Sequence, residues 1–163
     1  MVTIRLQKVS DAERFFDILN NPNFIYFDVQ PKTLEDEIAW LEQNTQRQKD
    51  NIQWNYTILY DKNIVGAIGV QINYHRRYIG EIGYFIDENY WNKGIACKAV
   101  KLFEIICINK LNLKRIEISM MPENTASERV AIKNHYLKEG FLHKLIQGKD
   151  GKMKDCLLYA KTF

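Results

Sequence analysis

The sequence predicts an α/β protein of mixed α+β character, in which helices cover the faces of a mostly antiparallel sheet. Apolar patterns with the period of a strand and with the period of a helix follow one another along the whole chain. The middle of the chain contains three consecutive strand-like segments joined by short turns, which is typical of an antiparallel meander. A strand, a helix and another strand follow, and this order implies one parallel pair of strands.

The first third of the chain predicts one strand and two helices. Alternating residues favour a strand over 3–9, after which Ser10 caps a helix that ends near Leu19. The spacing Thr33-x-x-Asp36 is a capping box, and it predicts a second helix that continues toward Asn51.

The remainder predicts six strands and two helices. A helix over 94–109 forms the parallel crossover, and the cap-like spacing Thr125-x-x-Glu128 opens a helix that ends near residue 134. Asp61-Lys62-Asn63 and Asp150-Gly151 supply hairpin turns. The strands are expected at Gln53–Tyr60, 64–73, Ile79–Ile86, Arg115–Met120, Leu137–Gln147 and Met153–Thr162.

Composition narrows the class of protein. The chain has 163 residues, of which 46% are hydrophobic and 26% charged, which excludes a disordered or collagen-like protein. No repeat, linker or charge block divides it, so we expect residues 1–163 to form a single domain. The formal net charge of +3 falls short of the basic balance of a dedicated nucleic-acid binder.

Cysteine usage and hydropathy predict a cytoplasmic protein with no membrane partner. Cys97, Cys107 and Cys156 form no CxxC pair, so neither a disulfide framework nor a metal site is expected. Charged residues interrupt the N-terminal 16 residues, which excludes the core of a signal peptide, and the apolar stretches elsewhere are too short to span a bilayer.

A candidate anion site lies at residues 91–96, Trp91-Asn92-Lys93-Gly94-Ile95-Ala96, at the predicted start of the crossover helix. The positive end of a helix beside the carboxyl end of a strand attracts phosphate, and Gly94 and Ala96 let it approach the backbone. From the spacing alone, ordinary helix capping is the simpler explanation. The segment is neither a Walker loop nor GxGxxG.

Gly80 and Gly83 interrupt the strand Ile79–Ile86. Glycine inside a strand marks a bulge, a bend or a close approach. A bulge would separate this strand from its parallel neighbour and leave backbone groups available to an extended ligand, whereas a simple bend would not require a ligand.

These segments together resemble the GNAT superfamily of acyl-CoA-dependent N-acetyltransferases, and within it the RimJ/RimL type. Residues 91–96 resemble its pyrophosphate motif, with Trp91 in the first place as is usual in that branch. Residues 81–86 resemble its EIGYW-like strand, and residues 124–131 its NxxSxRVA-like segment. His135-Tyr136 stands where the family usually has Gly-Phe. The resemblance spans nearly the whole chain and implies a seven-stranded GNAT domain with a parallel fourth and fifth strand and about four helices.

The resemblance also implies acetyl-CoA (coenzyme A) as the acetyl donor. Backbone groups of Tyr84, Phe85 and Ile86 would pair with the pantetheine arm, and Asn124 would bind the pantetheine or an ordered water, or serve only as a helix cap. The N–H groups of the pyrophosphate motif would hold the pyrophosphate, through Asn92, Lys93, Gly94, Ile95 and Ala96.

Acetyl transfer needs a neutral amine, a donor for the oxyanion and a proton for the leaving thiolate. Glu81 is the candidate base, acting directly or through water, although a strand carboxylate is also explained as a surface charge. Ser127 or Tyr136 is the candidate proton donor, although Ser127 fits the first turn of a helix and Tyr136 fits a core. A backbone N–H near Phe85 is the expected oxyanion donor.

The expected acceptor is a primary amine, first a protein N-terminal α-amine and next a small amine. Deprotonating an α-amine at pH 7 costs about 1 kcal/mol, against about 4.6 kcal/mol for a lysine side chain. The loop residues Phe24, Tyr26 and Phe27 correspond to a segment that faces the acceptor in the resembling family. An acidic set that would favour polycations is equally explained as charges at a helix start, Asp28, Glu35, Asp36 and Glu37.

Two other classes of function remain as alternatives. A non-catalytic acyl-CoA-binding sensor or scaffold would keep residues 91–96 without needing Glu81 or Ser127. A nucleic-acid binder would use the locally basic C-terminal part, which a solvated surface explains more simply: Lys133, Lys138, Lys144, Lys149, Lys152 and Lys154. The resembling family includes monomers and dimers, and a homodimer is one expected state.

Overall fold

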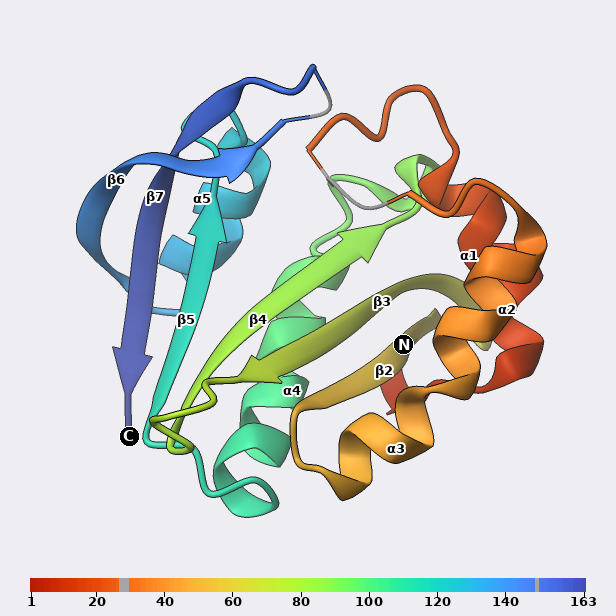
Figure 1. Ribbon diagram of the computed structural model, residues 1–163, viewed down its shortest axis with the longest axis horizontal. Helices are drawn as coiled ribbons and strands as arrows, with labels where there is room; N and C mark the ends of the chain where they lie inside the picture. Colours follow the sequence, from red (N-terminus) through yellow and green to blue (C-terminus); the bar gives the residue numbers. More distant parts are fainter. Residues whose placement is uncertain (27–29, 149) are drawn as a thin grey trace.

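The computed structural model describes residues 1–26, 30–148 and 150–163 (Figure 1). Over these described residues, seven strands form one sheet in the order β1-β2-β3-β4-β5-β7-β6, in which only β4 and β5 pair in parallel. The strands are β1 Val2–Leu6, β2 Gln53–Tyr60, β3 Asn63–Ile72, β4 Ile79–Ile86, β5 Arg115–Met120, β6 Leu137–Gln147 and β7 Met153–Thr162.

Helices cover both faces of this sheet. Figure 1 shows α4 behind the strands, while α1, α2 and α3 lie together at the β1–β3 side. Two single turns of 3-10 helix, η1 Val9–Asp11 and η2 Glu88–Tyr90, precede α1 and α4. The α-helices are α1 Ala12–Leu19, α2 Leu34–Glu42, α3 Asn44–Lys49, α4 Ile95–Asn109 and α5 Thr125–Lys133.

The predicted fold class is confirmed, and every predicted strand and helix is present with small shifts at the ends. The first helix begins at Ala12 because η1 takes up the residues around Ser10. The second predicted helix is two helices, and the second begins at Asn44. That buried amide donates to the Gln7 side chain at 2.9 Å and accepts from Asn55 at 2.9 Å. The predicted single helix is therefore divided at the point where Asn44 bonds to side chains of Gln7 and Asn55.

Local signals account for the helix starts. Thr33 Oγ1 accepts from the Asp36 N–H at 3.2 Å, and the Asp36 carboxylate accepts from the Thr33 N–H at 3.0 Å, as the capping box predicts. The cap of α5 is Asn124 rather than Thr125, because the Asn124 side chain accepts from the Ser127 N–H at 3.1 Å. Each cap satisfies N–H groups that have no partner inside the helix.

Left-handed backbone conformations occur at the predicted turns. Asp61 and Lys62 have φ of 48° and 71°, which is the twist that a two-residue hairpin between β2 and β3 requires. His135, where the resembling family has glycine, has φ of 64° after the end of α5. The turn there therefore places a side chain in a conformation that glycine adopts more easily.

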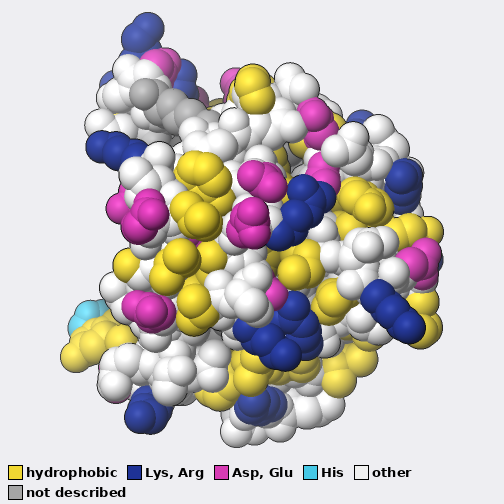
Figure 2. Space-filling model, turned by 90° about the vertical axis from the view of Figure 1, so that its right-hand side faces the viewer, with side chains coloured by type: hydrophobic (Ala, Val, Ile, Leu, Met, Phe, Trp, Pro, Cys, Tyr) yellow, Lys and Arg dark blue, Asp and Glu magenta, His cyan; other side chains and the backbone are white. Residues whose placement is uncertain are grey.

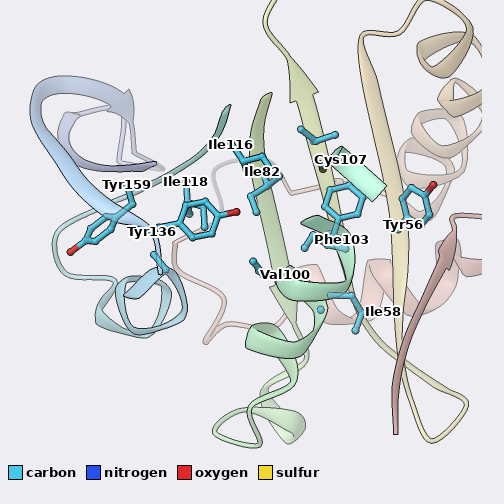
Figure 3. Packing of buried hydrophobic residues seen from close by; sticks show 14 of the residues in the cluster. Tyr56, Ile58, Ile82, Val100, Phe103, Cys107, Ile116, Ile118, Tyr136 and Tyr159 are labelled. Carbon is cyan, nitrogen blue, oxygen red and sulfur yellow. The ribbon is translucent and has the colours of Figure 1, made fainter. Parts of the chain in front are cut away.

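The hydrophobic core lies on both faces of the sheet. On one face, Val100, Phe103 and Cys107 of α4 pack against β-strand side chains such as Ile82 and Ile118 (Figure 3). On the other face, a smaller cluster joins α1 and α2 to the sheet through Phe15, Leu41, Ala67 and Phe85. Alternate residues of β4 therefore pack in the two clusters on opposite faces of the sheet, because side chains alternate along a strand.

A buried ion pair ties β1 to the start of α1. The Arg5 guanidinium donates to both Asp11 carboxylate oxygens at 2.7 Å, and the Thr57 hydroxyl donates to the same carboxylate at 2.6 Å. Burial alone would raise the pKa of Asp11, but the bonds from Arg5, Thr57 and the Lys8 N–H hold it below its usual value. The folded protein therefore favours the ionised form of the Asp11 carboxylate.

Candidate active site

The two parallel strands separate partway along their length. β4 and β5 pair only at Ile79/Arg115, Gly80/Ile116 and Glu81/Glu117, and beyond these positions they diverge (Figure 1). The pairing of β4 with β3 continues without any register shift through Gly83 to Ile86. β4 is therefore bent away from β5 and contains no bulge. Of the two explanations for Gly80 and Gly83, a bulge or a bend, the structure shows the bend.

The alternation of the ladder decides which backbone groups face the opening. Asp87 donates to the Val65 carbonyl and Ile79 accepts from Asn73, so the odd-numbered residues of β4 bond to β3. In an antiparallel ladder the intervening residues direct their N–H and C=O groups the other way. The backbone of Tyr84 and of Ile86 therefore faces the opening beside β5, whereas the backbone of Phe85 faces β3.

The loop between β4 and α4 is held by side chains at its base. Asp87, which is almost fully buried, forms an ion pair with Arg14 and accepts from the Asn89 N–H at 2.9 Å. The Trp91 indole N–H donates to the Ile86 carbonyl at 2.7 Å. The Trp91 side chain therefore bonds to the last residue of β4. This bond gives the tryptophan a structural role at the first position of the candidate phosphate segment.

Two residues with positive φ turn this loop into α4. Asn92 has φ of 60°, and Gly94, the N-cap residue, has φ of 71° and makes no side-chain cap. The first N–H groups of a helix have no partner inside it, and the helix dipole makes this end positive. The 15-residue helix α4 therefore presents the backbone N–H groups of Ile95 and Ala96, which have no partner inside the helix.

A cavity of about 520 Å³ lies over this helix start. The side chain of Lys93 lies elsewhere, since its ammonium donates to the Asn89 carbonyl at 2.9 Å and lies 4.8 Å from the centre of the Tyr90 ring. The other predicted donor-binding residues line the cavity: Tyr84, Phe85, Ile86, Trp91, Asn92, Gly94, Ile95, Ala96 and Asn124.

Helix α5 adds positive charge that the sequence interpretation did not assign to the site. Arg129 and Lys133 line the cavity one helical turn apart. Burial raises the pKa of the Cys97 thiol on α4, and the nearby Lys133 ammonium offsets part of that rise. The sequence signal that could have placed them in the site is the i, i+4 spacing of these two basic residues, which follow Ser127 on the same helix. Together with the α4 N-terminus, these charges suit a polyanionic ligand.

A second cavity, of about 280 Å³, lies where β4 and β5 diverge. Among the residues that the structure describes, none of those lining it is charged. Four of them also line the first cavity, so the two cavities meet at Tyr26, Tyr84, Asn124 and Ser127. The rest of the lining comes from both strands and the β6 end: Ile82, Gly83, Ile118, Ser119, Met120, Met121 and Ile146.

Glu81 does not line either cavity. Its exposed side chain lies on the face of β4 to which position 83 also belongs, and Gly83 lines the second cavity. The next two residues of the strand, Ile82 and Gly83, both line the second cavity. The carboxylate is therefore near the opening without entering it.

Ser127 and Tyr136, the two candidate proton donors, lie in different places. Ser127 lines both cavities and forms a 2.9 Å hydrogen bond with the Tyr84 hydroxyl. Tyr136 is buried in the core between α5 and the sheet (Figure 3) and lines neither cavity. Burial, together with the Glu104 carboxylate, raises the pKa of Tyr136 far above its usual value. Only Ser127 is close to the shared wall.

The loop after α1 contributes to both cavities. Tyr26 lines both, and its hydroxyl donates to the Glu123 carbonyl at 3.2 Å, which joins this loop to the start of α5. Phe24 lines the larger cavity and packs edge-on against Phe85. Phe27 lies outside the described residues.

The acidic set at the start of α2 lies away from the cavities. Asp36 belongs to the capping box, and neither it nor Glu35 or Glu37 lines a cavity. Acidic and basic side chains are interspersed on the face that carries α1 and α2 (Figure 2). Asp28 and Lys149 lie outside the described residues.

The described ranges contain neither a cluster of metal ligands nor a membrane-spanning helix. No group of three or more His, Cys, Asp or Glu side chains there is arranged to hold a metal ion. No helix in the same ranges is both long enough and apolar enough to span a membrane.

Comparison with solved structures shows the same fold in other acetyltransferases. The chain superposes on the ribosomal-protein-S5-alanine acetyltransferase of Vibrio fischeri with a TM-score of 0.88 and 26% identity, over 99% of this chain and 92% of that one. It superposes on Mycobacterium smegmatis RimJ in complex with CoA-disulfide with a TM-score of 0.90 and 22% identity, over 99% and 81% of the two chains.

Sequence comparison gives the family. The chain is 31% identical over 145 residues to the uncharacterized N-acetyltransferase YnaD of Bacillus subtilis, over 88% of this chain and 83% of that protein. It is 26% identical over 164 residues to the uncharacterized N-acetyltransferase p20 of Bacillus licheniformis, over 98% and 91% of the two proteins. The family model of the acetyltransferase (GNAT) domain matches residues 2–136. The chain therefore belongs to the GNAT acetyltransferase family, as an acetyl-CoA-dependent N-acetyltransferase.

Proposed function

We propose that this enzyme transfers the acetyl group of acetyl-CoA to a primary amine, with a protein N-terminal α-amine as the first acceptor and a small amine as the second. The observation that carries the proposal is the junction of two cavities of different character. One is lined by the α4 N-terminus and basic side chains, and the other, between β4 and β5, has a neutral lining over the described residues.

The phosphates of acetyl-CoA would bind at the start of α4. The backbone N–H groups of residues 92–96 are the proposed donors, and the positive φ of Gly94 supports this role because it turns the backbone without a side chain. Arg129 and Lys133 supply two positive charges on the same cavity wall. Acetyl-CoA carries several negative charges, so this combination suits it.

The pantetheine arm would extend from there along β4. The backbone groups of Tyr84 and Ile86 that face the opening are the proposed partners, in the manner of an added strand. The Trp91 indole N–H already donates to the Ile86 carbonyl, so the Ile86 N–H and the Tyr84 carbonyl are the stronger candidates. Asn124 lines both cavities, and its amide N–H can contact the arm while its oxygen caps α5.

The thioester would then lie at the wall that the two cavities share. Glu81 is the proposed base, and it takes the amine proton through a water molecule, since its side chain lies outside both cavities. The Tyr84 N–H is the proposed oxyanion donor, in place of the Phe85 N–H expected from the sequence. Ser127 is the proposed donor to the leaving thiolate, and Tyr136 is the weaker candidate because it lies in the core.

The second cavity supports an α-amine as the acceptor. An α-amine loses its proton at a cost of about 1 kcal/mol at pH 7, so a carboxylate acting through water is a sufficient base. Its described lining has no carboxylate that would pair with the distal charges of a polyamine. The relative from Vibrio fischeri, 26% identical to this chain, is a ribosomal-protein-S5-alanine acetyltransferase, which further supports a protein N-terminus.

Two broader expectations belong to the same proposal. A cytoplasmic location is supported by the three cysteines, which are all free thiols. A homodimer is supported by the 11-residue edge strand β6, which exposes Leu137, Phe141 and Leu145. Sedimentation of the wild-type chain beside Phe141→Lys tests the dimer, because a charge on this edge should shift a dimer toward monomer.

The acceptor is tested by thiol release from acetyl-CoA in the presence of N-terminal peptides, polyamines, aminoglycosides and amino acids. We expect turnover with a peptide N-terminus to exceed turnover with any polyamine. Turnover confined to polyamines would contradict the acceptor assignment while leaving the acetyltransferase activity intact.

A further inference from the structure

A pair of hydroxyl groups lies at the wall between the two cavities. The Tyr84 hydroxyl on β4 and the Ser127 Oγ on α5 are 2.9 Å apart, and either atom can be the donor. Both residues line both cavities. The Tyr84 ring therefore reaches from the strand to the helix across the place where the acetyl-bearing end of the donor would lie.

The position of Ser127 is fixed from two directions. Its N–H donates to the Asn124 side chain at 3.1 Å, which holds the first turn of α5. Its hydroxyl has one hydrogen and two acceptor positions. If the Ser127 hydrogen pointed to Tyr84, no hydrogen would remain for a ligand in the cavity, whereas a hydrogen donated by Tyr84 leaves the Ser127 hydrogen available.

The Tyr84 hydroxyl is suited to be the donor of this pair. Burial raises the pKa of Tyr84 to about 12, with the hydrogen bond to Ser127 offsetting part of the rise, so Tyr84 keeps its proton throughout the neutral range. Its other acceptor, the Ser127 carbonyl, is 3.5 Å away, at the limit of a hydrogen bond. The shorter contact to Oγ is the stronger one.

We propose that Tyr84 is a positioning residue, whose hydroxyl donates to Ser127 Oγ and thereby directs the Ser127 hydrogen toward the sulfur of the leaving thiolate. This inference rests on the proposed function. As the amine nitrogen forms its bond to the carbonyl carbon and the C–S bond breaks, the electron pair of that bond passes to sulfur. The Ser127 hydroxyl stabilises this charge through its hydrogen bond and passes its proton to the sulfur, and the Ser127 oxygen regains a proton from water. No proton leaves Tyr84.

The kinetic test compares Tyr84→Phe, Ser127→Ala and the double variant. Tyr84→Phe should lower kcat about tenfold and leave the KM for acetyl-CoA within about twofold, because it removes a hydrogen bond that strengthens only as charge develops. The double variant should be no slower than Ser127→Ala alone, since Tyr84 acts through Ser127. A tenfold loss from Tyr84→Phe in the Ser127→Ala background would overturn the proposal.

Tyr159→Phe is the matched control. Tyr159 is also a buried tyrosine bonded to α5, through a 2.6 Å hydrogen bond to Glu128, but it lines neither cavity. Figure 3 shows its hydroxyl pointing away from the sheet centre that Tyr136 faces. Its kcat should equal that of the wild type. An equal loss of kcat in Tyr159→Phe and Tyr84→Phe would mean that both act only through the stability of α5.

A second readout does not depend on any acceptor. The thiolate of bound CoA absorbs in the ultraviolet, so titration of the complex gives the apparent pKa of the bound thiol. That pKa should be higher in Tyr84→Phe and in Ser127→Ala than in the wild type and in Tyr159→Phe. An identical thiol pKa in all four would overturn the inference even if the wild type acetylates amines. A shift in the expected direction without any turnover would contradict the proposed function alone.

Discussion

Glu81 of β4 and Glu117 of β5 lie directly opposite each other at the last position where the two parallel strands pair. Beyond this pair the strands diverge, and the second cavity begins at Ile82, the next residue along β4. The Glu117 carboxylate accepts from the Arg115 guanidinium at 2.6 Å, so its charge is already paired. Among the residues that the structure describes, Glu81 has no ion pair, and it is the proposed base.

Glu81→Gln should lower kcat by about 100-fold, the range in which positioned general bases act, and leave the KM for acetyl-CoA nearly unchanged. The reason is that glutamine keeps the shape of the side chain but cannot accept the amine proton. The measurement is steady-state thiol release with the preferred acceptor. Glu117→Gln is the control and should keep most of the activity; equal losses in the two variants would show that charge alone matters.

Gly94→Ala should weaken acetyl-CoA binding. A side chain at φ of 71° costs about 1 kcal/mol of backbone strain, and a methyl group there would occupy the surface that the phosphates approach. Gly151→Ala is the matched control, because Gly151 has φ of 74°, and a Cβ at either glycine meets no atom within 4 Å. Both variants should lose similar stability in thermal unfolding. Calorimetry should show a raised Kd for acetyl-CoA only in Gly94→Ala, and an unchanged Kd there would contradict the phosphate site.

Asp11 should contribute stability that depends on pH. Its pKa is lowered on folding, so its contribution is complete above the unfolded pKa near 4 and is lost as the pH falls toward the lower folded value. Asp11→Asn should reduce stability at pH 7 by about 1–3 kcal/mol and flatten the fall of Tm below about pH 5. Asp17→Asn, on the exposed side of α1, is the control. A Tm profile for Asp11→Asn parallel to that of the wild type would refute this.

Tyr136→Phe should stabilise the protein or leave its stability unchanged. Among the residues that the structure describes, the Tyr136 hydroxyl is a buried polar atom without a hydrogen-bond partner, and removing such a group recovers up to about 1 kcal/mol of desolvation cost. Tyr159→Phe, which loses its bond to Glu128, should be destabilised by about 1–2 kcal/mol in urea unfolding. Destabilisation of Tyr136→Phe to the same extent would mean that its hydroxyl is bonded.

The sequence predicted the fold well because its signals are local. The capping box at Thr33 and the hairpin residues Asp61 and Lys62 act within a few positions, and the structure uses them as expected. The split of the second helix was missed because its cause is distant, since Asn44 turns inward to side chains of Gln7 and Asn55. Contacts of that kind have no periodic pattern.

The site was predicted in part for the same reason. The proposed phosphate segment is contiguous, so residues 92–96 could be recognised together, and all of them except Lys93 line the larger cavity. Whether Ser127 or Tyr136 reaches the opening depends on how α5 packs on the sheet, and spacing along one strand or helix does not carry that information. The direction of the backbone at Phe85 depends on which residues of β4 bond to β3, which only the register reveals.

The most direct test of the account is thiol release from acetyl-CoA by the wild-type chain beside Glu81→Gln, with an N-terminal peptide as acceptor and a polyamine in parallel. The account predicts turnover with the peptide, about 100-fold slower in Glu81→Gln, and little with the polyamine. Thermal shift in the same samples should show stabilisation of both proteins by acetyl-CoA. Equal turnover by wild type and Glu81→Gln would contradict the role of Glu81, and no stabilisation of either would contradict acetyl-CoA binding at the two joined cavities.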